Sequence, residues 1–111
     1  MSNNKGLVVV LVTAPRGKGK EIASKIVESK LAACVNVVSS ITSFYWWEGK
    51  VVEDQEELLI IKTKSCLVGR LKEYVKKIHP YTVPEIVVLG AVDVLREYHE
   101  WAVKETLPCE G

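Results

Sequence analysis

The sequence predicts a single α+β domain, and two observations carry that prediction. Apolar residues form unbroken or β-branched runs in some segments, which is typical of strands, and recur at helical spacing in others. The chain has 111 residues, of which 48% are hydrophobic, enough to bury a core without disulfides. We therefore treat residues 1–111 as one domain, with residues 1–6 as a polar leader.

The N-terminal third predicts a strand followed by a helix. Residues 7–12 are an unbroken run of valine and leucine, which predicts a strand covered on both faces and ended by residues 13–15. After the turn at residues 17–19, apolar side chains recur at helical spacing from Ile22 to Leu31, with charged residues between them. This pattern predicts an amphipathic helix that lies on the sheet.

Two long strands joined by a tight turn are predicted next. Residues 34–47 are dense in valine, isoleucine, threonine and aromatic residues, and residues 51–63 return as a second strand. Between them, Glu48, Gly49 and Lys50 supply a turn with a glycine available for positive φ. The length of the two strands predicts a hairpin that projects beyond the domain.

The C-terminal half predicts a helix, a strand and a final helix. Ser65 is expected to cap a helix over residues 67–78. A buried strand follows over residues 86–92, with a bulge or a close approach expected at Gly90. Asp93 is expected to cap the last helix, which completes the series of elements.

The order strand, helix, strand, strand, helix, strand and terminal helix is that of a ferredoxin-like split βαβ sandwich. Right-handed crossovers place the two main helices on one sheet face and leave the other face uncovered. The predicted hairpin adds four consecutive aromatic residues, 44–47, which a monomer has difficulty burying. We therefore expect identical chains to cover this surface and close a symmetric ring.

Charge and cysteine usage exclude several classes of protein. The formal net charge of +1 favours neither nucleic acid nor a membrane surface as a partner. The N-terminal apolar run is too short for a membrane span and lacks the flanks of a secretory signal, so we expect a cytoplasmic protein. Cys34, Cys66 and Cys109 are scattered, so reduced structural thiols are expected, with Cys66 the better candidate for oxidation or soft-metal capture.

Several blocks of sequence resemble the CutA family of divalent-cation-tolerance proteins. They are VTAP at 12–15, KLAACVN at 30–36, SFYWWEGK at 43–50, ELLIIKT at 57–63 and HPYTVPE at 79–85, together with Tyr98 and Trp101. The resemblance covers nearly the whole domain, and it implies a ferredoxin-like subunit in a tight homotrimer that exchanges hairpins between neighbours. It also implies a build similar to the PII signalling proteins, and an association with tolerance of divalent cations and with copper binding.

The copper-binding pattern of some bacterial family members is only partly present in this chain. Their first-strand cysteine aligns with Val12 and their His-His pair aligns with Ile78 and His79, so only His79 keeps a nitrogen ligand. A lone imidazole rarely holds a divalent ion, so His79 as a copper or zinc ligand needs Glu85 or copies from other subunits as partners. The alternative is that His79 ends a helix and interacts with its dipole and last carbonyls.

A small-molecule pocket in a cleft between subunits is predicted from five residues in these blocks. They are Tyr45, Trp47, Lys62, Tyr81 and Glu85. Together they offer aromatic faces, a cation and a carboxylate, which suit a small anionic ligand. The alternative is that the two hairpin aromatics are interface anchors, the lysine is a solvated strand end and residues 79–81 form a stiff turn; one cleft can serve both purposes.

No pattern in the chain indicates catalysis. The loop over residues 13–20 has glycines, cations and exposed amides ahead of a helix, as anion-binding turns do. It lacks the spacing of the P-loop and of the dinucleotide fingerprint, so an ordinary connection is the favoured interpretation. With His79 and His99 as its two histidines and no Ser-His-Asp or zinc-protease pattern, the chain is expected to bind rather than catalyse, without an organic cofactor.

Three functions remain as hypotheses. The leading one is a homotrimer that captures a divalent cation, Cu(II) foremost, in the response to metal ions, and its metal part depends on the family resemblance. The second is a PII-like sensor that binds a small anionic ligand between subunits and signals to a partner protein. The third is a structural trimer that serves as an assembly platform.

Overall fold

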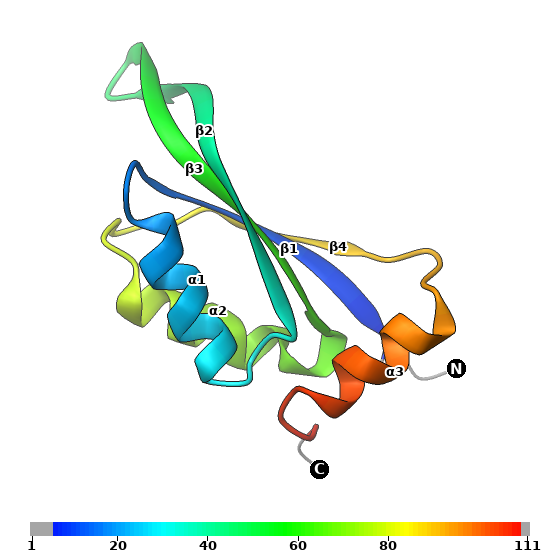
Figure 1. Cartoon of the computed structure of the whole chain (residues 1–111). Helices are drawn as coiled ribbons and strands as arrows, with labels where there is room; N and C mark the ends of the chain where they lie inside the picture. The colour runs from blue at the N-terminus through cyan, green and yellow to red at the C-terminus, as the bar shows by residue number, and fades with distance from the viewer. Residues whose placement is uncertain (1–5, 110–111) are drawn as a thin grey trace.

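The computed structural model describes residues 6–109 and confirms the predicted order of elements. The elements are β1 (Leu7–Pro15), α1 (Gly19–Glu28), β2 (Cys34–Trp47), β3 (Lys50–Lys64), the 3-10 turn η1 (Ser65–Leu67), α2 (Val68–Ile78), β4 (Ile86–Gly90) and α3 (Arg96–Lys104). The strands form one antiparallel sheet in the order β2-β3-β1-β4 (Figure 1). All but Gly6 of the predicted polar leader lies outside the described residues.

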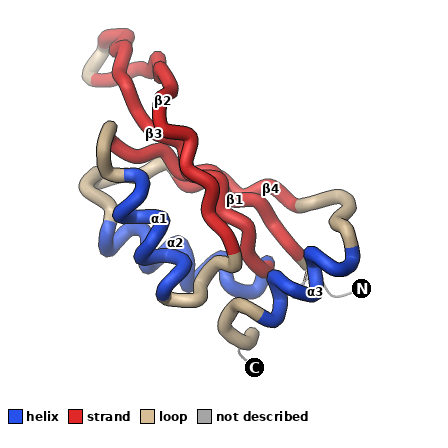
Figure 2. The backbone as a smooth tube through the Cα atoms, in the orientation of Figure 1, coloured by secondary structure: helices blue, strands red, loops and turns tan. Residues whose placement is uncertain are grey.

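Helices α1 and α2 cover one face of the sheet, as the crossover rule predicts (Figures 1 and 2). The side chains of β1 alternate: Val8, Val10 and Val12 are buried, whereas Val9 and Leu11 are only partly buried. The prediction of a strand covered on both faces is therefore wrong for the single chain. β1 also continues to Pro15, which pairs with β3, rather than ending after residue 12.

The β2-β3 hairpin projects from the domain as predicted, and the molecule measures 44 × 26 × 25 Å (Figure 1). Trp47 pairs with Lys50, so the connecting loop has two residues, Glu48 and Gly49. Both have positive φ, 50° and 80°, as a primed hairpin turn requires. A register shift in β2 between Val38 and Ile41 separates the base of the hairpin from its projecting part.

Several predicted boundaries in the helices and in β4 are wrong by a few residues. Helix α1 ends at Glu28 rather than near residue 31, because Lys30 adopts a left-handed conformation with φ of 64°. β4 ends at Gly90, which pairs regularly with Val8 and has no atom within 4 Å of an added Cβ, so no bulge or close approach exists there.

The predicted cap of the last helix is also wrong. Helix α3 begins at Arg96 after Leu95, and the Asp93 carboxylate accepts a hydrogen bond from the Val94 amide instead. At the other predicted cap, Ser65 is the first residue of the 3-10 turn η1, and Leu67 occupies the N-cap position of α2. None of the helices described within residues 6–109 is long and apolar enough to cross a membrane.

The expectation of three reduced thiols is corrected by a disulfide between Cys66 and Cys109. It joins the turn before α2 to the segment after α3, across a sequence separation of 43 residues. A hydrogen bond from the Leu107 amide to the Lys30 carbonyl fixes the same C-terminal segment at the end of α1. Cys34 is the free cysteine, and it is partly buried.

Candidate functional site

The five residues of the predicted pocket do not meet within one chain. Tyr45 and Tyr81 lie near each other at the projecting hairpin, where both contribute to one electrostatic cluster. Lys62 lies six residues beyond Glu56 on β3, which corresponds to about 20 Å along the strand. Trp47 is exposed at the hairpin tip, and Glu85 is exposed just before β4.

Two phenol–carboxylate pairs form a cluster at the hairpin, which we call the phenol–acid cluster: Tyr45, Asp54, Glu56 and Tyr81. The Tyr81 hydroxyl donates to Glu56 Oε2 at 2.7 Å, and the Tyr45 hydroxyl donates to Asp54 Oδ2 at 3.2 Å. The two acids are alternate residues of β3 and therefore share a face of the strand. Sequence reasoning missed both acids because it did not fix the pairing of β2 with β3.

The environment of the phenol–acid cluster keeps both phenols protonated. Burial is the main cause, and the hydrogen bond to Glu56 and the charges of Glu56 and Asp54 act with it to raise the pKa of Tyr81 well above 10.0. Burial and the hydrogen bond to Asp54 likewise raise the pKa of Tyr45. The cluster therefore presents two acids, each with one phenol donor, to whatever approaches it.

His79 stands beside this cluster and is buried with both ring nitrogens in use. Its Nε2 lies 2.8 Å from the Thr13 carbonyl oxygen, and its Nδ1 accepts from the Tyr81 amide at 3.0 Å. This pair of contacts fits a neutral imidazole with hydrogen on Nε2. The ring also lies 4.8 Å from the Tyr81 ring, so His79 connects the end of β1 to the loop that positions Tyr81.

The described residues of a single chain do not bring together a donor set for a copper ion. A metal at His79 would have to displace either the Tyr81 amide or the Thr13 carbonyl, because both ring nitrogens are engaged. Val12 is fully buried in the apolar core, and Ile78 packs against that core. Within residues 6–109 there is no group of three or more His, Cys, Asp or Glu placed to hold a metal.

The glycine-rich loop after β1 does bind an anion, and that anion is a side chain of the same protein. The buried carboxylate of Glu57 accepts hydrogen bonds from the amide of Gly17 at 3.0 Å and from that of Gly19 at 2.7 Å. An added Cβ at Gly19 would lie 2.5 Å from Glu57 Oε1. The Glu57 carboxylate therefore caps the N-terminus of α1 from within the same chain, in line with the favoured interpretation of the loop as an ordinary connection.

A second polar cluster lies at the other end of the sheet and contains the predicted Lys62. Cys34 and Lys62 are direct cross-strand partners, and both donate to Asn36 Oδ1, the thiol at 3.8 Å. Tyr98 of α3 lies against Cys34; burial first, and then the neighbouring thiol, raise the pKa of the Tyr98 phenol. We call these four residues, Cys34, Asn36, Lys62 and Tyr98, the thiol–lysine cluster.

Comparison with known proteins gives one family. A model of the CutA1 divalent ion tolerance protein matches residues 8–105. The divalent-cation tolerance protein CutA of Thermus thermophilus is 52% identical over 99 residues, 88% of this chain and 96% of that protein. Several plant and animal relatives are longer, and this chain spans about half of their length.

Solved structures agree with this relation. The crystal structure of CutA1 from Oryza sativa superposes with a TM-score of 0.90 at 48% identity and covers 96% of this chain and 98% of that one. The PII-like protein CutA from Nostoc sp. PCC 7120, solved in apo form, superposes with a TM-score of 0.85 at 34% identity, covering 90% and 97%. The ferredoxin-like architecture described above is therefore that of a known group of proteins.

Proposed function

The chain belongs to the CutA1 divalent ion tolerance family, and from this premise we propose that it acts as a homotrimer that binds divalent cations, copper among them, in the response to metal ions. The family relation supports the cation part of this proposal. The surface of the hairpin supports the assembly. The phenol–acid cluster, on the other face of the same hairpin, supports the position of the site.

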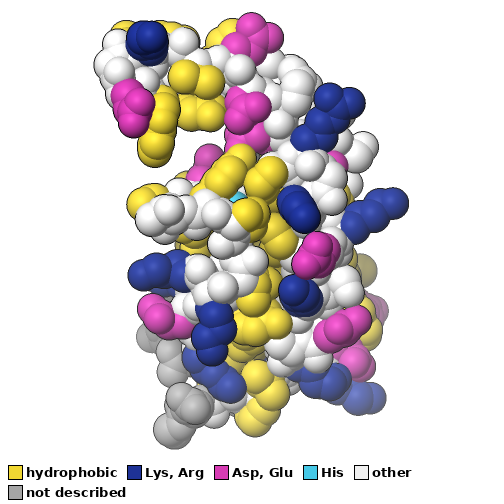
Figure 3. Space-filling model, turned by 90° about the vertical axis from the view of Figure 1, so that its left-hand side faces the viewer, with side chains coloured by type: hydrophobic (Ala, Val, Ile, Leu, Met, Phe, Trp, Pro, Cys, Tyr) yellow, Lys and Arg dark blue, Asp and Glu magenta, His cyan; other side chains and the backbone are white. Residues whose placement is uncertain are grey.

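The observation that carries the assembly is an apolar patch on one face of the hairpin, made of Phe44, Trp46 and Val51. Their exposed fractions are 67%, 74% and 58%. The two aromatics alternate on β2, and Trp46 is the cross-strand partner of Val51, so all three share one face. Figure 3 shows hydrophobic side chains at the overhanging hairpin end and further hydrophobic side chains down the middle of the side that faces the viewer. A patch of this kind needs a partner surface.

Assembly would also complete the sites that one chain leaves divided. Tyr45 and Lys62 lie too far apart along the sheet to touch one ligand, so a cleft that contains both needs the hairpin of one subunit against the sheet of another. The phenol–acid cluster offers two carboxylates, and a divalent cation in a protein takes more donors than two. We therefore place the proposed cation site between subunits, with His79 joining it only if assembly releases a ring nitrogen.

Sedimentation equilibrium at micromolar protomer concentration tests the assembly. We expect a trimer for the wild type, and dissociation for Val51→Glu, because that substitution places an unpaired charge in the proposed interface. Val27→Glu is the matched control: the residue is on α1, 39% exposed, lies outside the hairpin patch and receives the same change. A wild-type monomer, or equal masses for both variants, would refute the proposed trimer.

Calorimetric titration with Cu(II) and Zn(II) tests the cation site. We expect heat of binding in the wild type and a loss of affinity in Asp54→Asn, with Glu53→Gln, a neighbouring exposed acid, as control. Unchanged copper affinity in His79→Ala would remove His79 from the ligand set. Absence of heat for both metals in a protein shown to be trimeric would overturn the cation proposal itself.

A second candidate function is a PII-like sensor of a small anionic ligand, and the thiol–lysine cluster favours it. The Lys62 ammonium is held by Asn36 on a partly exposed strand, which suits an anion better than a metal cation. Titration with a nucleotide panel tests this function, with Lys62→Gln as the variant and Lys50→Gln at the hairpin turn as the control. A heat of binding for a nucleotide but for neither metal favours the sensor. If neither titration gives a heat of binding, the structural platform is the remaining hypothesis.

A further inference from the structure

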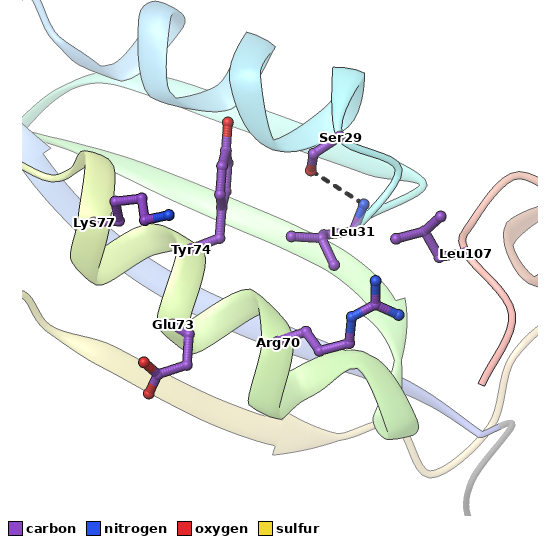
Figure 4. Close-up of a pocket in the computed structure, with 7 residues that line it drawn as sticks. All are labelled: Ser29, Leu31, Arg70, Glu73, Tyr74, Lys77 and Leu107. Atoms are coloured by element: carbon purple, nitrogen blue, oxygen red, sulfur yellow. Dashed lines mark hydrogen bonds between the residues drawn. The ribbon is translucent and has the colours of Figure 1, made fainter. Parts of the chain in front are cut away.

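A cavity of about 450 Å³ lies on the helix side of the molecule, between the end of α1, the outer surface of α2 and the C-terminal segment. Its lining residues are Ser29, Leu31, Arg70, Glu73, Tyr74, Lys77 and Leu107 (Figure 4). This volume falls in the range of small-molecule sites in proteins. The cavity has no residue in common with the phenol–acid cluster, the thiol–lysine cluster or the hairpin patch.

One part of the cavity wall, at Ser29, Leu31 and Leu107, is held in place. Leu31 is 6% exposed, and Leu107 packs against the hydrophobic core from the C-terminal segment. That segment is fastened by the Leu107 amide to the Lys30 carbonyl at 3.0 Å and by the disulfide two residues further on. The Ser29 hydroxyl is committed as well, because it donates to the Ile26 carbonyl and accepts from the Leu31 amide. These three residues therefore have little freedom to move into the cavity.

The charges around the cavity are not balanced. In Figure 4 the Arg70 guanidinium is directed between Leu31 and Leu107 and the Lys77 ammonium points toward Tyr74, whereas the Glu73 carboxylate is directed away from the cavity. Neither cation forms an ion pair within residues 6–109. A guanidinium beside a leucine wall, with its donors unpaired, is suited to a carboxylate that carries an apolar body.

We propose that this cavity binds a small monocarboxylate with an aromatic or aliphatic body, which Arg70 holds at the carboxylate and Leu31 and Leu107 hold at the body. Lys77 adds a second positive charge at the far end of the site. None of the residues that line the cavity belongs to the hairpin patch, so the trimer proposed above does not require them. Its existence depends neither on metal binding nor on the subunit clefts.

Amide chemical-shift titration of the full chain with three probes tests the proposal. The probes are 4-phenylbutyrate, its neutral alcohol 4-phenylbutanol, and inorganic phosphate. We expect 4-phenylbutyrate to shift the amides of Leu31, Arg70 and Leu107 and to bind about tenfold more tightly than either other probe, because only it offers both the charge and the body. Equal affinity for acid and alcohol, equal affinity for phosphate, or shifts confined to the hairpin would overturn the proposal.

Two variants separate the two halves of the site. Arg70→Gln should remove the preference for acid over alcohol, whereas Lys72→Gln, an exposed cation on the same helix but outside the cavity lining, should leave it unchanged. Leu107→Ala should weaken both organic probes by a similar factor and keep the preference. Retained shifts elsewhere in the spectrum confirm that each variant is folded. A preference that survives in Arg70→Gln refutes the assignment of the carboxylate to that residue.

Discussion

The cap of α1 by Glu57 leads to a prediction whose size can be worked out from its contacts. Glu57→Ala removes the acceptor of two backbone amides, those of Gly17 and Gly19. Gly17 is exposed, so water can replace the carboxylate there, but Gly19 is buried and its amide is left without a partner. An unpaired buried amide costs about 1–3 kcal/mol, and the lost charge at the helix N-terminus adds to that. We expect a loss of about 2–3 kcal/mol per chain.

Graded variants make this prediction specific. Glu57→Gln keeps an oxygen that can accept from Gly19, so it should cost about 1 kcal/mol. Gly19→Ala should be as harmful as Glu57→Ala, because its Cβ would lie 2.5 Å from Glu57 Oε1. Glu53→Gln, on the same strand but exposed, should stay within about 0.5 kcal/mol of the wild type.

Urea unfolding and amide hydrogen exchange check these values together. Unfolding must be compared at one protomer concentration, because assembly makes the apparent stability concentration-dependent. Exchange at Gly19 should accelerate in Glu57→Ala and stay near the wild-type rate in Glu53→Gln. If Glu57→Ala unfolds like the control, or if the wild-type Gly19 amide exchanges without protection, the capping argument is refuted.

Two further predictions concern the disulfide and the partly buried phenol of Tyr81. Reducing the Cys66–Cys109 bond should cost about 4 kcal/mol in the chain-entropy model, and thiol titration of the native oxidised protein should count one reactive cysteine, Cys34; three would contradict the bond. The raised pKa of Tyr81 means that its contribution to stability is complete below pH 10.0, the unfolded value, and is lost as the pH rises above it. Alkaline unfolding should therefore become shallower in Tyr81→Phe, and an unchanged profile would rule out this contribution.

The elements that could be predicted from sequence are those that local chemistry decides. The two-residue turn at Glu48 and Gly49 and the hairpin around it follow from a glycine between two β-rich segments. Helix ends are less predictable, because a polar side chain near a boundary can form its hydrogen bond with a backbone group outside the helix. Asp93 bonds the amide next to it, so the helix begins three residues later, at Arg96.

The features that could not be predicted depend on the register of distant segments. Glu57 reaches the glycine loop because β1 pairs with β3 so that Ala14 faces it, which no local pattern reveals. The disulfide depends on the segment after α3 returning to the start of α2. The disulfide also bears on the expected cytoplasmic location. Thiol pools in the cytoplasm would keep an accessible disulfide reduced, so in that compartment the bond forms only if it is shielded from them.

Neighbouring glutamates on β3 illustrate how structural and functional acids differ in this fold. Because side chains alternate along a strand, Glu57 faces the helices and Glu56 faces the open side of the sheet. Two backbone amides satisfy Glu57, and its use is internal. Glu56, equally buried at 7% exposure, is given one phenol hydrogen bond, from Tyr81. A buried carboxylate has room for more donors than that. Of the two acids, Glu56 is therefore the one whose bonding a cation or a neighbouring subunit would complete.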